Sequence, residues 1–111
     1  MKRYSFTKAE RILRREEFRA TAKGRRLPAG GFVIYIKPNG LGHPRLGVSV
    51  SKKVGRATRR SRLKRLVREF FRLNKERLPQ STDILIVCRP GCQADSLSQV
   101  TEELGGVLFK G

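Results

Sequence analysis

The amino-acid sequence predicts an α+β fold, a single domain over residues 1–111 in which helices pack against a small mixed sheet in the order α-β-β-α-β-α. Residues 31–38 and 45–51 alternate apolar and polar side chains, as half-buried strands do. Between residues 56 and 77 the apolar spacing changes to three and four, the period of a helix. The run DILIVCR at 83–89 is continuously apolar and rich in β-branched residues, which is typical of a buried strand. A chain of this length has room for one modest core.

The first helix is expected within about residues 7 to 23. Thr7 is followed three residues later by Glu10, the spacing of a capping box. Apolar residues then recur at roughly helical spacing until Gly24, which ends the pattern.

The two alternating strands are expected to form a hairpin, because the turn-rich sequence PNGLGHP joins them. Tyr35 lies on the face of the first strand opposite to its most apolar residues. The corresponding face of the second strand carries only Gly47, Ser49 and Ser51. This pairing predicts a shallow groove with an aromatic ring in its floor; ordinary half-exposed sheet surface is the alternative for Tyr35.

The long central helix is expected from Arg56 to Arg77, before Pro79. Its apolar residues fall within an arc of roughly 100°, a width suited to packing on a sheet: Leu63, Leu66, Val67 and Phe70.

A last helix is expected after Ser96, a suitable N-cap residue. Its apolar stripe comprises Leu97, Val100, Leu104 and Leu108. The adjacent Gly105 and Gly106 should cost about 2 kcal/mol relative to alanines, so the last turn is expected to be frayed or absent.

The charge of the chain is strongly positive. Lys and Arg number 26 against 9 Asp and Glu, a formal net charge of +17. Nucleic acid is the commonest partner of so basic a domain, and an anionic membrane surface is the main alternative. The first 17 residues contain no run of seven apolar residues, so we expect neither a signal peptide nor a membrane span. We expect a cytoplasmic location.

Cysteine, histidine and carboxylate patterns argue against catalysis by the chain alone. Cys88 and Cys92 form CRPGC, which fits neither a redox C-x-x-C motif nor a four-ligand zinc site, and free thiols are expected. His43 is a single histidine between turn residues, and the nine acidic residues are scattered. We therefore predict no catalytic residues and no metal site in the protein.

Cations form a row on the central helix. Arg60, Lys64 and Arg68 stand at i, i+4 and i+8, beside the apolar arc and bordering the sheet. Other cations extend the positive surface, Arg65 and Arg72 toward solvent and Arg59 and Arg62 on the opposite flank. Arg56 and Arg59 lie near the helix start, where the macrodipole disfavours cations, which favours a phosphate docking between them.

Two other interpretations of this helix are less favoured. A solvated face should be balanced by ion pairs, yet twelve Lys and Arg face two Glu between Lys52 and Arg77. A basic membrane-surface helix needs a free apolar face, which the sheet is expected to cover.

The stretch SKKVGRATRRSRLKRLVRE resembles the signature of the bacterial ribonuclease P protein subunit. The signature positions are filled in register by Lys53, Gly55, Ala57, Arg60, Arg62, Lys64, Arg65 and Arg68. The blocks REEF, FVIY, RLGVSVSKK and DILIV also resemble the family, so the similarity spans about residues 10 to 90. Ser61 replaces the family's asparagine and lacks its paired amide donor and acceptor. Ala22 stands where family members often have an aromatic residue, which implies weaker base stacking.

The resemblance implies a function in tRNA processing. The family protein is a subunit of an endoribonuclease and is inactive on its own. The catalytic RNA of that enzyme removes the 5′ leader of precursor tRNA, and the RNA holds most of the Mg²⁺. The expected partners are that catalytic RNA and precursor tRNA. We expect neither membrane binding nor a required protein partner. The resemblance also implies the left-handed β-α-β crossover of the ribosomal protein S5 domain 2-like fold. A noncatalytic structural RNA-binding protein, such as a ribosomal component, is the alternative, and a nuclease in its own right comes last.

The expected site has two parts. Phe18 and Tyr35 are candidates for stacking leader bases in a cleft between helix and sheet, with Lys52 and Lys53 as phosphate contacts at its mouth. The expected RNA-binding residues are Lys52, Lys53, Arg56, Arg59, Arg60, Ser61, Arg62, Lys64, Arg65 and Arg68.

Overall fold

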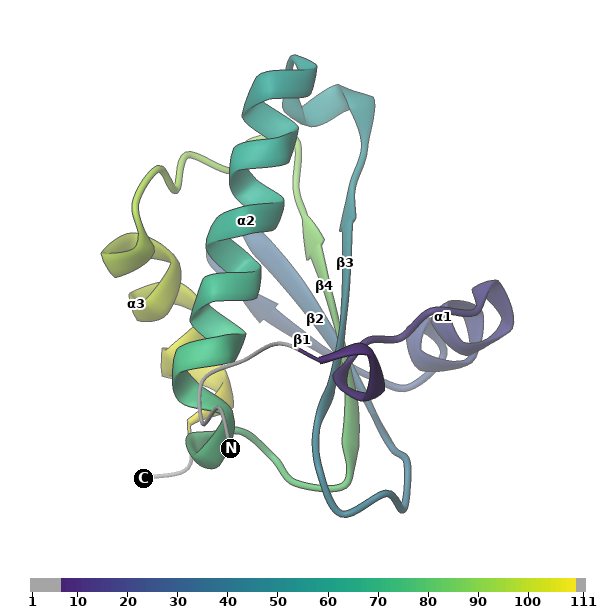
Figure 1. Cartoon of the computed structure of the whole chain (residues 1–111). Helices are drawn as coiled ribbons and strands as arrows, with labels where there is room; N and C mark the ends of the chain where they lie inside the picture. Colours follow the sequence, from purple (N-terminus) through teal and green to yellow (C-terminus); the bar gives the residue numbers. More distant parts are fainter. Residues whose placement is uncertain (1–6, 110–111) are drawn as a thin grey trace.

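The computed structural model describes residues 7–109, so residues 1–6 and 110–111 of the expected domain lie outside the described range. The regular elements are α1 (Arg15–Ala22), β1 (Arg25–Ala29), β2 (Phe32–Pro38), β3 (Arg45–Val50), α2 (Ala57–Asn74), β4 (Thr82–Cys88) and α3 (Leu97–Leu108). Three short 3-10 turns, η1 (Lys8–Glu10), η2 (Lys52–Val54) and η3 (Lys75–Arg77), complete them. Figure 1 shows α2 and α3 on one face of the sheet and α1 on the other. The predicted α+β class, with a small mixed sheet, is confirmed.

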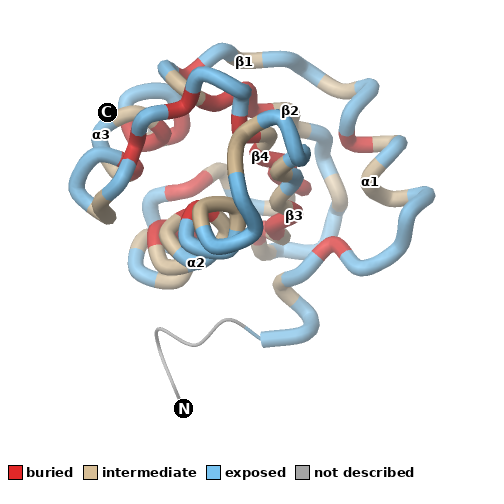
Figure 2. Tube along the Cα trace, turned by 90° about the horizontal axis from the view of Figure 1, so that it is seen from above, coloured by how far each residue is buried: buried red, intermediate tan, exposed pale blue. Residues whose placement is uncertain are grey.

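The main core lies between the sheet and α2 with α3. Fully buried side chains of α2 meet those of the central strands and of α3, among them Leu63, Val67, Phe70, Ile34, Ile84, Ile86, Val100 and Leu104. Figure 2 shows this concentration of buried residues, in red, along the sheet and the inward sides of both helices. On α1, by contrast, Thr21 is the one residue classed as buried. The apolar arc predicted for the central helix is thus confirmed as its sheet-facing side.

The expected hairpin is wrong. The strand order is β1-β2-β4-β3, so β4 lies between the two strands that were expected to pair. β4 pairs antiparallel with β2 and parallel with β3. The physical reason is in the side chains of β4: Ile84 and Ile86 are buried on one face and Leu85 on the other, as a central strand requires. Alternation in β2 and β3 identifies strands but not their partners.

β1 was not expected at all. Its sequence RRLPA carries two arginines and a proline, which weaken the signal of a strand. Pro28 is tolerated because β1 is an edge strand that pairs with β2 on one side.

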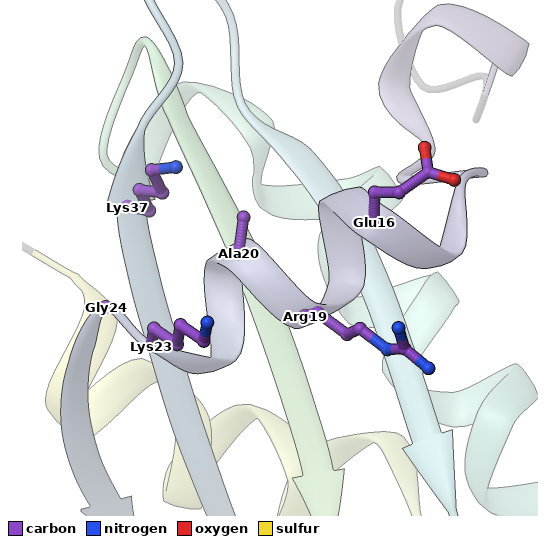
Figure 3. A pocket seen from close by; sticks show the side chains of 6 residues that line it. All are labelled: Glu16, Arg19, Ala20, Lys23, Gly24 and Lys37. Atoms are coloured by element: carbon purple, nitrogen blue, oxygen red, sulfur yellow. The ribbon is translucent and has the colours of Figure 1, made fainter.

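The crossover from β3 through α2 to β4 is left-handed. β3 and β4 are parallel neighbours, so α2 forms a β-α-β unit with them. In Figure 1 α2 lies to the left of the sheet and β3 is nearer to the reader than β4, and Figure 3 shows the same order of strands from the α1 side. Viewed with α2 in front and both strands pointing up, the chain steps to the left, against the general rule for such units. This is the handedness that the resemblance implied.

The first predicted helix is shorter than expected. The Thr7 N–H donates to Oε1 of Glu10 at 2.9 Å, as the capping box requires, but only the 3-10 turn η1 follows. Ile12 then leaves the helical path: its N–H donates to the Leu46 carbonyl at 3.0 Å and its side chain is buried. Burying Ile12 against the edge of β3 is favoured over continuing the helix, and α1 begins only at Arg15.

The expected fraying at the end of α3 is wrong. Ser96 does cap the helix, its Oγ accepting from the Gln99 N–H, but α3 continues through both glycines to Leu108. A Cβ on Gly105 would lie 2.6 Å from Cε2 of Phe109, so the missing side chain makes room for that ring. The Phe109 ring in turn stacks on Phe70 with centroids 5.6 Å apart, and this packing offsets the low helix propensity of glycine.

Candidate nucleic-acid interface

The helix α1 crosses the face of the sheet that α2 and α3 leave open. Across that face Tyr35 of β2, Leu85 of β4 and Gly47 of β3 occupy one row, because Leu85 is the register partner of both others. Phe18 of α1 lies over Gly47: a Cβ there would be 2.8 Å from Cε1 of its ring. Glycine at this position thus lets an aromatic ring approach the backbone of β3.

Tyr35 is half-buried on the same face as Phe18, two strands away, about 10 Å at the usual strand spacing. The expectation that Tyr35 has only small neighbours is wrong, because β2 pairs with β4 and not with β3. Its partners are Arg26 and Leu85, and the small residue Gly47 lies one strand further. The two candidate stacking residues therefore share a sheet face without being adjacent.

A small hollow of about 190 Å³ opens where α1, β3 and α2 meet. Phe18 and Gly47 line one part of it, and Arg68 of α2 reaches it from the other side. The remaining lining residues are mainly apolar: Arg11, Ile12, Leu13, Leu46 and Val48. The hollow thus joins an aromatic ring and a cation from the long helix at one edge of the sheet. Tyr35 does not line it.

The flank of α2 that carries Arg60, Lys64 and Arg68 faces this edge, since Arg68 lines the hollow. Arg60 donates from Nε to the Gly55 carbonyl at 3.2 Å, which fixes it beside the start of the helix. Ser61 and Arg65 are exposed on the outward side.

The other flank of α2 is engaged with the loop before α3. Arg62 Nε lies 2.8 Å and Arg59 Nη1 3.3 Å from Oδ1 of Asp95. Arg59 also donates to the Cys92 carbonyl at 3.1 Å. The predicted split of α2 cations into two flanks is confirmed, but Asp95 compensates part of the charge of Arg59 and Arg62.

The chain entering α2 adds three exposed cations. Lys52 and Lys53 lie in the turn η2, directly after β3, and Arg56 is the N-cap residue of α2. The positive surface therefore extends from the end of β3 onto the first turns of α2.

A second hollow, on the outer side of α1, had no counterpart in the sequence analysis. Figure 3 shows the side chains that line it: Glu16, Arg19, Ala20, Lys23, Gly24 and Lys37. Arg19 and Lys23 are four residues apart on one helix, a spacing that could have indicated a shared face. The third cation, Lys37, comes from β2, and only the pairing of strands brings it there.

The two cysteine thiols lie in the core. Cys88 and Cys92 are free and buried, and burial raises the pKa of Cys88 to about 12, so its thiol stays protonated at neutral pH. Among residues 7–109 no group of three or more His, Cys, Asp or Glu side chains is placed to hold a metal ion. Within the same range, none of the helices combines the length and apolar character needed to cross a membrane.

Comparison with known proteins identifies the family. The Ribonuclease P family model matches residues 6–110. The chain is 41% identical over 111 residues to the ribonuclease P protein component of Syntrophus aciditrophicus, covering 99% of this chain and 93% of the relative. It is 45% identical over 86 residues to that of Thermotoga maritima, covering 77% and 74%.

Solved structures agree. The ribonuclease P protein from Thermotoga maritima has a TM-score of 0.80 at 36% identity, with 92% of this chain and 99% of that chain covered. The protein from Staphylococcus aureus has a TM-score of 0.80 at 32% identity, with 93% and 100% covered. Because the family model spans almost the whole chain, and these relatives and structures agree with it, the chain belongs to the ribonuclease P protein family.

Proposed function

We propose that this chain is the protein subunit of a cytoplasmic bacterial ribonuclease P, and that it binds both the catalytic RNA and the 5′ leader of precursor tRNA. In this function the RNA performs the cleavage and the protein holds the substrate. The leader is removed and the mature 5′ end of the tRNA results.

The hollow where Phe18 and Arg68 meet is the observation that carries the proposal. Single-stranded RNA offers bases that stack on aromatic rings and phosphates that bind cations. Phe18 supplies the ring and Arg68 the cation, and Tyr35 offers a second ring on the same sheet face. Lys52 and Lys53, which are exposed directly after β3, would bind phosphates where the RNA strand enters the cleft.

The outward side of α2 and its two flanks suit the catalytic RNA. Its exposed or half-exposed cations lie on one rigid helix of 18 residues, which presents charge to a folded RNA at fixed spacing. We assign this contact to Arg56, Arg59, Arg60, Ser61, Arg62, Lys64, Arg65 and Arg68.

Metal chemistry belongs to the RNA in this proposal. The described residues supply no cluster of metal ligands, so we propose that the catalytic RNA holds the Mg²⁺ of the holoenzyme. The protein would assist by neutralising phosphates near that site, which lowers the Mg²⁺ concentration the RNA needs.

Reconstitution tests the proposal. Purified protein is mixed with a ribonuclease P RNA and precursor tRNA at low Mg²⁺, and we expect it to stimulate release of the 5′ leader. Binding without stimulation would indicate a structural RNA-binding protein. Cleavage in the absence of the RNA would indicate a protein nuclease.

Salt dependence gives a second test. Affinity for the catalytic RNA should fall by about 0.7 to 0.9 log units per log unit of salt for each phosphate contacted. A flat salt titration would contradict the assignment of the α2 cations to RNA phosphates.

A further inference from the structure

We propose that Arg19, Lys23 and Lys37 form a second phosphate-binding surface, which holds the precursor-tRNA leader after it has passed the Phe18 hollow and crossed over α1. The inference rests on the proposed function of leader binding. It assigns to α1 the role of a ridge over which the RNA backbone runs.

The charge of this surface is only partly compensated within the described residues: Glu16 lines the hollow, and Lys37 lies near enough to Asp83, its partner on β4, for its charge to lower the pKa of that carboxyl. The hollow beside α1 measures about 460 Å³ and is lined by three cations and one carboxylate, Glu16. Arg19, Lys23 and Lys37 are exposed, and none of the ion pairs found among residues 7–109 includes them. Three cations around an open hollow raise the local concentration of anions.

The lining indicates phosphate rather than base recognition. The other lining residues, Ala20 and Gly24, are small, and among residues 7–109 no aromatic ring lines the hollow. Without a ring there is no surface on which a base would stack. Two lysines and an arginine instead bind phosphates regardless of nucleotide sequence.

The three cations follow one another across α1. In Figure 3 the Arg19 side chain points away from Lys37 and toward the C-terminal end of β3. Lys23, one turn further along, lies near the C-terminal end of α1 on the same flank as Arg19, and Lys37 stands on β2 beyond the opposite flank. Phe18, which precedes Arg19, lies over β3. An RNA strand leaving Phe18 would therefore meet Arg19, then Lys23, then Lys37.

The placement of α1 favours the leader over the catalytic RNA as the source of these phosphates. α1 and α2 lie on opposite faces of the sheet, so an RNA bound along α2 is separated from Lys37 by the sheet itself. The leader bound at Phe18 is already on the α1 face. A helix is about 10 Å across, so a few additional nucleotides reach the far side.

Leader length provides the test. Affinities of holoenzymes reconstituted with wild-type protein or with the double variant Lys23→Ala/Lys37→Ala are measured for two precursor tRNAs, one with a leader that ends at the Phe18 hollow and one with a leader about ten nucleotides longer. We expect the double variant to bind the long-leader substrate about three- to tenfold more weakly, with a reduced salt slope, and the short-leader substrate as wild type does.

Two further variants sharpen the test. Lys8→Ala removes an exposed lysine from η1, outside both hollows, and should change neither affinity. Glu16→Gln removes the carboxylate that repels phosphate and should strengthen long-leader binding about two- to threefold. Thermal melts of all variants verify that each is folded.

Each outcome decides the proposal. Equal affinities of the double variant and wild type for the long leader would overturn it. Equal losses on both leaders, with weaker assembly, would assign the cations to the catalytic RNA and overturn it as well. Failure of the wild-type holoenzyme to distinguish a leader-bearing substrate from mature tRNA would instead contradict the proposed function.

Discussion

Arg45 and Asp83 face each other across the parallel ladder of β3 and β4, and two hydrogen bonds join them: Nη2 to Oδ2 and Nε to Oδ1, both 2.7 Å. The third guanidinium nitrogen, Nη1, lies 3.1 Å from Oε2 of Glu17 on α1. One arginine therefore holds α1 to the sheet, one residue before Phe18. We therefore expect this contact to help position the proposed stacking ring, Phe18.

Replacing Asp83 by asparagine should destabilise the fold. Asp83→Asn keeps the shape of the side chain but leaves Arg45, whose side chain is only 16% exposed, without its main counter-charge. The free energy of unfolding should fall by about 3 kcal/mol, measured by urea denaturation. Asp95→Asn is the matched control: that carboxyl is 69% exposed, and its loss should cost less than about 1 kcal/mol. Equal losses in the two variants would contradict this account.

The same carboxyl predicts a loss of stability in acid. Burial raises the pKa of Asp83, but hydrogen bonds from Arg45 and Asn39 and the charge of Arg45 outweigh it, so the pKa lies below its ordinary value. A lowered folded-state pKa means stability that is full above the unfolded-state pKa of about 4 and is lost as pH falls through the folded-state pKa. Denaturation of the wild type below pH 4 should show a steeper loss than that of Asp83→Asn. Parallel curves would show that Asp83 does not contribute.

Variants in the two proposed RNA-binding surfaces should differ in which assay they affect, binding of leader-bearing substrate or assembly with the catalytic RNA. Tyr35→Ala should weaken binding of leader-bearing substrate by about 1–3 kcal/mol with little effect on assembly, whereas Tyr35→Phe keeps the ring and should bind as wild type. Arg60→Ala should weaken assembly with the catalytic RNA. Arg68→Ala should weaken both, because Arg68 belongs to α2 and also lines the Phe18 hollow. Equal effects of all the alanine variants in both assays would contradict the division of roles.

The two adjacent glycines of α3 should respond in opposite directions to alanine. Gly106→Ala adds a methyl group to open space and should raise stability by about 0.5–1 kcal/mol, because alanine favours the helix. Gly105→Ala would collide with the Phe109 ring and should lower stability by about 1–3 kcal/mol. Thermal melts compare them, and stabilisation by both would show that Phe109 does not need the space.

Removing Asp95 should strengthen RNA binding. Asp95 accepts from both Arg59 and Arg62, so it competes with phosphate for these cations. Asp95→Asn should increase affinity for the catalytic RNA about two- to fivefold at low salt, with the difference disappearing as salt screens the charges. A decrease would indicate that Asp95 instead orients the two arginines for RNA.

Local periodicity was sufficient to predict α2, its apolar arc and its two cationic flanks, because a helix of fixed period determines which residues share a side. The capping of α3 by Ser96 was likewise a local property. Strand pairing was not predictable in this way. Nothing in the alternation of β2 specifies β4 as its partner, and Pro28 with its neighbouring arginines concealed β1 altogether.

The site shows the same division between local and long-range information. The row Arg60, Lys64 and Arg68 followed from spacing, whereas the meeting of Phe18 with Arg68 required the positions of α1 and α2 around β3. The ion pairs of Asp95 and Asp83 join residues more than 30 positions apart, and no spacing rule indicates them. Whether the predicted residues bind RNA stays a prediction until the experiments above are done.

The central position of β4 has a consequence for synthesis on the ribosome. β2 and β3 leave the exit tunnel first, and until residue 88 follows, β2 has only β1 to pair with, a two-stranded ribbon that is marginal in water. The nascent chain thus carries the whole basic segment of α2 before its sheet can close. During that interval the cations of α2 lack the sheet that holds them in place, and the arrival of one late strand completes their shaped surface.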